Sequence, residues 1–162
     1  MNDANLKTRV ETDAQQITQQ IVVDEVFPHA PQTIWRTLTT GDLIGRWLME
    51  PTGFEPVEGK RFTFQTKPAG AWDGVIHCQV LEVIANERLA YSWKSGDEKN
   101  VGYGSRLDTV VTWTLTKVGS ATRLRLVHSG FVTPKNDSAF DSMGGAWPKV
   151  VQSIGSLAGE SH

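Results

Sequence analysis

Residues 139–154 read AFDSMGGAWPKVVQSI, with the apolar spacing of an amphipathic helix. Gly144 and Gly145 stand just before Trp147, and the spacing predicts that they share the buried face of that helix. Glycine in a helix interior costs about 1 kcal/mol relative to alanine, so a closely packed helix has little reason to carry two together. The pair therefore predicts missing volume beside a large ring. Pro148 predicts a bend or a restart of the helix, because proline removes one backbone hydrogen bond.

The composition is that of an ordinary globular protein: 162 residues, 39% hydrophobic and 21% charged. A net charge of -2 without any basic run gives no basis for binding nucleic acid or anionic membranes. The single cysteine, Cys78, excludes an intramolecular disulfide. No apolar run approaches the length of about 20 residues that spans a bilayer, so membrane insertion is not expected. We expect a cytoplasmic protein with a polar N-terminal arm (residues 1–16) and a single domain (residues 17–162).

Periodicity predicts an α+β order of elements along residues 17–162. An alternating pattern predicts a first strand at residues 17–27, and Pro31 suits the start of a short helix. A second short helix follows, and Thr39 with Asp42 resembles a capping box before it. Later alternating segments, separated by turns, predict antiparallel strands at residues 61–66, 74–84, 88–94, 107–118 and 122–129. The expected sheet has six or seven strands, and the C-terminal helix must cover one of its faces.

Large apolar side chains recur on one face of each later strand and along one stripe of the C-terminal helix. The strand period places Leu89, Tyr91 and Trp93 together, and it does the same for Val111, Trp113 and Leu115. The other sets are Leu124, Leu126 and His128 in the last strand, and Met143, Trp147, Val150, Val151, Ile154 and Leu157 in the helix. These sets should face one another. They form either a solid core or the walls of a ligand cavity.

Catalytic motifs are absent from the sequence. The four histidines (His29, His77, His128 and His162) show no ligand spacing, so neither a metal site nor a cofactor is predicted. No nucleophile elbow, P-loop or dinucleotide fingerprint occurs, and no catalytic residue is predicted. His128 is the one titratable group expected inside. It is either a core histidine bonded to a backbone carbonyl or a pocket residue that orients a ligand or acts as a general base.

Several motifs occur in the order of a known superfamily. They are PHAPQTIWRTL at 28–38, Trp47, VLEV at 80–83, ERLAYSW at 87–93, TRLRLVHSGF at 122–131 and GAWP at 145–148. Together they resemble the START and birch-pollen-allergen superfamily (SRPBCC). Within it, they are similar to the branch named after the activator of the ninety-kilodalton heat-shock chaperone ATPase. The resemblance covers about residues 17–160.

The resemblance implies the helix-grip fold, in which a curved antiparallel sheet wraps round a C-terminal helix and leaves an apolar cavity. Members include lipid and hormone binders, polyketide aromatases and cyclases, and co-chaperones of the stress response, so the fold does not define the function. The leading hypothesis is the binding of a small hydrophobic or amphipathic ligand. Access would be gated by residues 95–105 and 51–59. The expected ligand-binding residues are Trp47, Tyr91, Trp93, Trp113, His128, Met143, Trp147 and Val151.

Two alternatives stay open. An enzyme of the aromatase, cyclase or hydrolase type would need His128 or Tyr91 to line the cavity. A co-chaperone would need a heat-shock chaperone as its partner, although this chain lacks the additional N-terminal domain of the eukaryotic activator. The sequence also leaves the oligomeric state open, including a homodimer.

Overall fold

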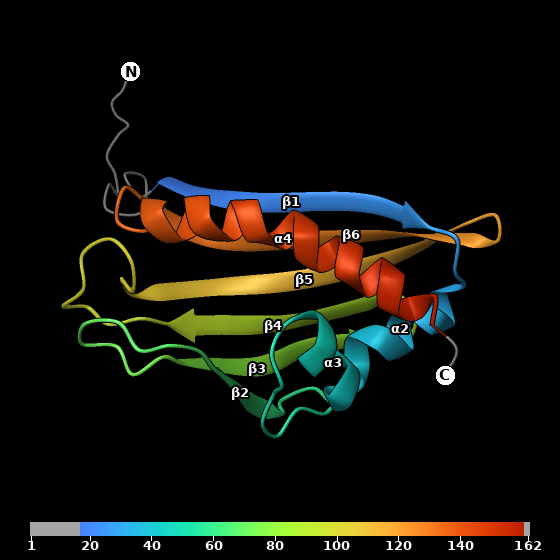
Figure 1. Cartoon of the computed structure of the whole chain (residues 1–162), viewed down its shortest axis with the longest axis horizontal. Helices are drawn as coiled ribbons and strands as arrows, with labels where there is room; N and C mark the ends of the chain where they lie inside the picture. The colour runs from blue at the N-terminus through green and yellow to red at the C-terminus, as the bar shows by residue number, and fades with distance from the viewer. Residues whose placement is uncertain (1–16, 161–162) are drawn as a thin grey trace, which may run out of the picture.

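The computed structural model describes residues 17–160; the predicted arm (residues 1–16) and His162 lie outside this range. Figure 1 shows the arrangement of its helices and strands. The strands are β1 (Ile17–Phe27), β2 (Arg61–Gln65), β3 (Val75–Ile84), β4 (Arg88–Ser95), β5 (Leu107–Val118) and β6 (Ala121–Thr133). The helices are α2 (Pro31–Thr39), α3 (Gly41–Trp47) and α4 (Asp137–Ala158). The predicted order of strand, two short helices, strands and long helix is confirmed.

The described strands form one antiparallel sheet in the order β1-β6-β5-β4-β3-β2. Strands β2 to β6 each pair with their neighbour in sequence, as short connections require. Strand β1 instead pairs with β6, with Ile21 opposite His128. Strand β6 continues to Thr133, past the predicted end at Ser129, because the first residues of β1 pair with the additional length.

A β-bulge interrupts the ladder between β1 and β6. Gln19 pairs with Phe131 and Gln20 pairs with Ser129, which leaves Gly130 without a partner in the register. Gly130 has a φ of 103°, a conformation that only glycine adopts without steric cost. A bulge bends the strand that carries it, so this one contributes to the curvature of the sheet around α4.

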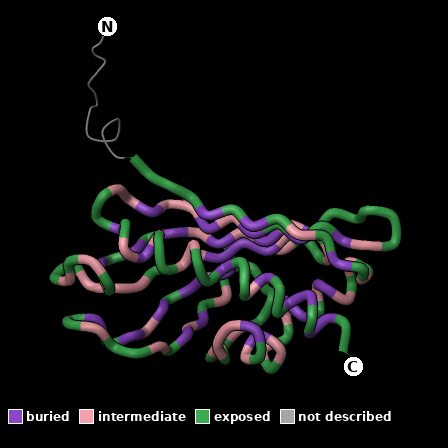
Figure 2. Tube along the Cα trace, turned by 45° about the horizontal axis from the view of Figure 1, so that its top comes forward, coloured by how far each residue is buried: buried purple, intermediate pink, exposed green. Residues whose placement is uncertain are grey.

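Helix α4 lies against one face of the sheet, where it contacts β1, β6, α2 and α3 (Figure 1). The strands bury alternate residues, as the period of two predicts, and Figure 2 shows buried and exposed positions alternating along them. In β5 the buried set includes Val111, Trp113 and Leu115, and in β6 it includes Leu126 and His128. The predicted inward faces are therefore confirmed, and the helix-grip architecture is the fold of this chain.

The predicted capping box before α3 is wrong. Thr40, not Thr39, is the N-cap residue, and its side chain makes no capping hydrogen bond. Thr39 is still inside α2, and its hydroxyl donates to the Trp35 carbonyl at 2.8 Å. A threonine within a helix can bond the carbonyl four residues earlier, which here removes the hydroxyl from the next helix.

The predicted place of the glycine pair in α4 is also wrong. Gly145 is exposed, Gly144 is half-buried, and a methyl group added to either would meet no atom within 4 Å. Gly145 lies two positions before Trp147, which is more than half a turn round the helix. The glycine that removes bulk beside a ring is Gly155, where an added methyl group would overlap the Phe27 ring.

Pro148 lies inside α4, and the helix continues from Asp137 to Ala158 without a restart. Figure 1 shows the axis of α4 changing direction near its middle, where Pro148 is located. A bend of this kind follows from the missing backbone donor and the clash of the ring with the preceding turn. It separates the first half of α4 from the second half, which packs near α2 and α3.

Candidate functional site

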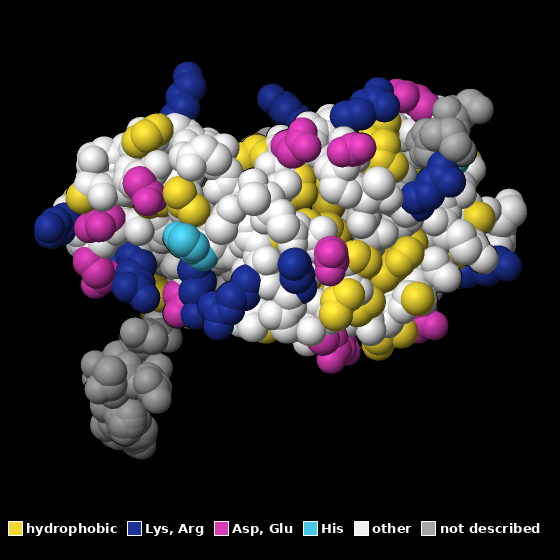
Figure 3. Space-filling view, turned by 90° about the horizontal axis from the view of Figure 1, so that it is seen from below, with side chains coloured by type: hydrophobic (Ala, Val, Ile, Leu, Met, Phe, Trp, Pro, Cys, Tyr) yellow, Lys and Arg dark blue, Asp and Glu magenta, His cyan; other side chains and the backbone are white. Residues whose placement is uncertain are grey.

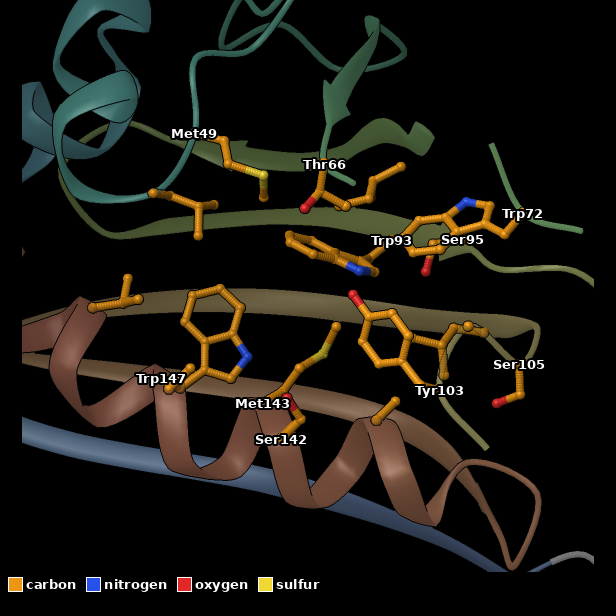
Figure 4. A pocket seen from close by; sticks show the side chains of 17 residues that line it. Met49, Thr66, Trp72, Trp93, Ser95, Tyr103, Ser105, Ser142, Met143 and Trp147 are labelled. Atoms are coloured by element: carbon orange, nitrogen blue, oxygen red, sulfur yellow. The ribbon is translucent and has the colours of Figure 1, made fainter. Parts of the chain in front are cut away.

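A cavity of about 200 Å³ lies between the first half of α4 and the sheet, beside the loop that joins β4 to β5 (Figure 4). Most of its wall is apolar. It is lined by Leu48, Met49, Thr66, Trp72, Ile76, Trp93, Ser95, Tyr103, Gly104, Ser105, Leu107, Ala139, Ser142, Met143, Ala146, Trp147 and Val150. A concave apolar space with a few hydroxyl groups is the usual form of a site for a small molecule.

The α4 wall owes its space to small side chains. Its lining residues follow helical spacing: Ala139, Ser142, Met143, Ala146, Trp147 and Val150. Ser142 and Ala146 are exposed at the mouth, and each fills less volume than its large neighbours Met143 and Trp147. The small side chains of α4 that line the cavity are thus alanine and serine, and the glycine pair does not line it.

The sheet wall is built round Trp93 of β4. Strand alternation places Tyr91 and Trp93 on the inner face. The Trp93 ring lies 5.7 Å from the ring centre of Phe64 and 6.0 Å from that of Trp147. Trp72 extends this wall from the segment before β3, and its indole N–H donates to the Val75 carbonyl at 2.9 Å.

The mouth of the cavity is formed in part by the β4–β5 loop, as the sequence predicts for residues 95–105. Tyr103 is 56% exposed and Figure 4 shows its ring extending over the cavity. Asn100 braces the loop: its side chain donates to the Ala69 carbonyl at 2.7 Å and accepts from the Ala71 N–H at 2.9 Å. Residues 51–59, the other predicted gate, do not line the cavity; Leu48 and Met49, just before them, do.

The cavity carries no ionic group among the described residues that line it. The hydroxyl-bearing residues of its lining are Thr66, Ser95, Tyr103, Ser105 and Ser142. Within residues 17–160, no three His, Cys, Asp or Glu side chains lie close enough together to hold a metal ion. The lining therefore favours a neutral, largely apolar occupant.

His128 lies behind the cavity wall in a hydrogen-bonded chain. Trp147 Nε1–H donates to His128 Nδ1 at 3.1 Å, and His128 Nε2 lies 2.8 Å from Thr109 Oγ1. Since an indole nitrogen can only donate, His128 Nδ1 must be unprotonated and Nε2 must carry the proton. Thr109 then accepts from His128 and donates to the Trp93 carbonyl at 2.7 Å. Each polar atom in the chain therefore has a partner.

Burial holds His128 in its neutral form. Its side chain is fully buried, and desolvation lowers its pKa to about 3. Of the two predicted roles, the structure shows a satisfied core histidine, although its partners are side chains and not a backbone carbonyl. Neither His128 nor Tyr91 lines the cavity, so the condition that the enzyme hypothesis set for these two residues is not met.

The structure places the eight predicted ligand-binding residues in two groups. Trp93, Met143 and Trp147 line the cavity. The others lie in the packed core outside its lining; they are Trp47, Tyr91, Trp113, His128 and Val151. The Trp113 and Trp47 rings pack edge to face, with ring centres 5.6 Å apart. The period of a strand identifies the inner face but not the position along it at which the core ends and the cavity begins.

Sequence reasoning missed several lining residues. Trp72, Tyr103 and Met49 lie in connections, where no period is available. Ser142 and Ala146 could have been found, because they lie one position before Met143 and Trp147 and share their side of the helix. Serine and alanine, like glycine, occupy little volume on the face of a helix.

Comparison with known proteins adds a family match. The sequence model of one family, described as "Activator of Hsp90 ATPase homolog 1-like protein", matches residues 28–159. A search among functionally curated proteins finds no match. Within the described residues, no helix has the length and apolar character needed to cross a membrane.

Solved structures share the fold. A crystal structure of a Mesorhizobium loti protein is 34% identical, covers 86% of this chain and 96% of its own, and has a TM-score of 0.73. The solution structure of the Aha1 dimer from Colwellia psychrerythraea is 18% identical, with coverages of 86% and 96% and a TM-score of 0.65. CalU16 from Micromonospora echinospora is 19% identical, with coverages of 90% and 85% and a TM-score of 0.66.

Proposed function

Because this chain belongs to the family of Activator of Hsp90 ATPase homolog 1-like proteins, whose helix-grip fold is a ligand-binding fold, we propose that it binds a small apolar or amphipathic molecule between α4 and the sheet. The observation that supports this most is the apolar cavity itself. The side chains of Trp72, Trp93, Met143 and Trp147 line this space and leave it open. Close packing is the rule in protein interiors, so an open volume of this size calls for an occupant.

The size of the cavity limits the ligand. Its volume of about 200 Å³ exceeds the roughly 150 Å³ of an engineered apolar cavity that binds benzene. A molecule with one ring or two fused rings matches this volume. A long acyl chain or a four-ring sterol would need the lining residues to move apart.

The test is a binding measurement on a variant with a filled cavity. Ala146→Leu adds a branched side chain at the mouth and keeps a good helix former. A panel of one- and two-ring hydrophobic compounds is titrated against both proteins by tryptophan fluorescence, because Trp93 and Trp147 line the cavity. We expect saturable binding to the wild type and at least a tenfold loss in Ala146→Leu.

The matched control is Gly145→Ala, one position away and outside the lining. It should bind the panel as the wild type does. Equal affinity in the wild type and in Ala146→Leu would place the bound compounds elsewhere on the protein. Failure of the whole panel to bind would overturn the proposal.

A co-chaperone role is a second candidate, favoured by the family description and by the likeness to the Aha1 dimer. Stimulation of a heat-shock chaperone ATPase by this protein, with co-purification of the two, would support it. No stimulation at excess protein would end it. The dimeric neighbour also makes a homodimer the first oligomeric state to test, by light scattering over a range of concentrations.

A further inference from the structure

One buried tryptophan differs from the others in its hydrogen bonding. The indole N–H groups of Trp47, Trp72, Trp113 and Trp147 donate to acceptors at 2.8, 2.9, 3.0 and 3.1 Å, respectively. Trp93 is only 3% exposed, and its Nε1 has no hydrogen-bond partner among the described residues. Buried polar groups in proteins are almost always paired, so this donor needs an explanation.

The unpaired donor belongs to the cavity wall. Trp93 lines the cavity, and Figure 4 shows the indole nitrogen on the edge of the ring that faces it. Phe64, His128 and Trp147 surround the ring, with ring centres 5.7, 5.4 and 6.0 Å from its own. The ring therefore cannot turn toward another acceptor without disturbing these contacts. An acceptor bound in the cavity would supply the missing partner.

We propose that the ligand carries a neutral oxygen acceptor, such as a ketone carbonyl, on a ring-sized apolar body, and that this oxygen accepts a hydrogen bond from Trp93 Nε1. An indole N–H donates and cannot accept, so the complementary group is an acceptor. No cationic side chain is among the described residues that line the cavity, and a buried carboxylate would lack a partner for its charge. This inference rests on the proposed binding function and names the chemistry of its ligand.

The test compares two bicyclic probes that differ mainly in the acceptor. 1-Indanone carries a ring ketone, and indane has the same fused rings without it. Binding of each is measured by calorimetry to the wild type and to Trp93→Phe. We expect the wild type to prefer 1-indanone by about three- to tenfold, the effect of one net hydrogen bond, and Trp93→Phe to lose that preference.

Trp72→Phe is the matched control. Trp72 also lines the cavity, but its N–H already donates to the Val75 carbonyl. This variant should weaken both probes to the same degree and keep the preference for the ketone. A second readout needs no variant: in an amide correlation spectrum of the wild type, 1-indanone should shift the Trp93 indole N–H downfield, whereas indane should not.

The outcomes separate the two proposals. Equal affinities for the two probes in the wild type, or a preference that survives in Trp93→Phe, would overturn the role of Trp93 while the cavity remains a binding site. The same holds if the indole N–H shift is equal for both probes. If other members of the panel bind but 1-indanone does not, this inference is overturned while the binding function stands. Failure of the whole panel would overturn both.

Discussion

Two indole groups at the cavity wall differ in a single hydrogen bond. Trp147 donates to His128, whose other nitrogen donates to Thr109, so this chain of groups is complete within the protein. Trp93 lies against the same histidine, with ring centres 5.4 Å apart, yet its N–H has no partner in the described part of the chain. The Trp147 N–H is therefore assigned to the core. The Trp93 N–H is available to a ligand.

The buried His128 predicts an acid-sensitive fold. Its pKa of about 3 in the folded protein lies below the ordinary value of 6.5. Between these two pH values the unfolded chain binds a proton at this histidine and the folded protein does not. Its contribution to stability is complete above pH 6.5 and is lost as the pH falls toward 3, at about 1.4 kcal/mol per pH unit. Urea unfolding at several pH values should show that the free energy of unfolding depends less steeply on pH in His128→Asn than in the wild type.

The comparison in that experiment is between slopes, so a lower overall stability of His128→Asn does not affect it. His77→Asn removes a histidine from the exposed side of β3 and serves as the control. Identical pH dependence in the wild type and His128→Asn would contradict a neutral buried imidazole.

Two glycines of α4 should respond in opposite directions to alanine. Gly145→Ala places a methyl group in open space and should stabilise the protein by about 1 kcal/mol through helix propensity. Gly155→Ala forces a methyl group onto the Phe27 ring and should destabilise by about 1–3 kcal/mol, the usual cost of overpacking. Chemical denaturation of both variants measures the difference. Changes of the same sign would contradict the packing described for α4.

At the scale of elements, the loop between β4 and β5 is held by backbone hydrogen bonds, such as Asp97 N–H to the Gly104 carbonyl at 2.9 Å, and by side chains. Asn100 bonds to backbone groups of Ala69 and Ala71, while Lys135 bonds to Glu98 at 2.9 Å. The hydrogen bond to Lys135 and its charge lower the pKa of Glu98. These contacts position Tyr103 over the cavity, so the loop has a defined place at the mouth.

Loosening this loop should speed amide hydrogen exchange in the loop and the dissociation of a bound ligand. Asn100→Ala removes two hydrogen bonds and should reduce the free energy of unfolding by about 1 kcal/mol. Amides 97–105 should exchange faster, and a bound probe such as 1-indanone should dissociate faster. Asn100→Asp keeps the acceptor for the Ala71 N–H, so its exchange and dissociation rates should lie between those of the wild type and Asn100→Ala. Unchanged exchange in Asn100→Ala would show that other contacts hold the loop.

At the scale of the whole molecule, α4 divides the interior into a solid half and a hollow half. After Pro148 its buried residues include Val151, Ile154 and Leu157, and this half lies near α2 and α3 (Figure 1). Before Pro148 the helix faces the cavity, and Val150, just after it, completes the lining from α4. Figure 3 shows basic, acidic and hydrophobic side chains interspersed on the face seen from below, so no single charge dominates that face.

Filling the hollow half with ligand should stabilise the whole fold. At a free 1-indanone concentration 100 times its Kd, the free energy of unfolding should rise by about 2.7 kcal/mol, because the ligand binds the folded state. The melting temperature should rise accordingly. The Ala146→Leu variant should show little or no rise at the same concentration. An equal rise in both proteins would indicate binding outside the cavity.

Much of this architecture could be predicted from residue order. The alternation in β5 and β6 predicts which side chains turn inward, and the motifs at 28–38 and 145–148 indicate the superfamily. Predictions from short stretches of sequence were wrong at the boundary between α2 and α3 and at the glycine pair of α4. Thr39 is a residue type that often caps a helix, but here it belongs to the helix before α3. The glycine pair lies away from the packed side of α4, which the neighbouring residues in the sequence do not indicate.

Periodicity thus established the order of elements and the inward faces, because these depend on spacing along one chain, and the resemblance to the superfamily implied the helix-grip fold. Whether an inward residue is enclosed in the core or borders the cavity depends on the side chains that pack against it from other elements. Trp113 and Trp93 share the same pattern, yet one is enclosed by Trp47 and Trp147 and the other borders a cavity. The unpaired Trp93 N–H is likewise a property of distances between segments far apart in sequence. Only the folded arrangement, through the packing of α4 on the sheet, sets those distances.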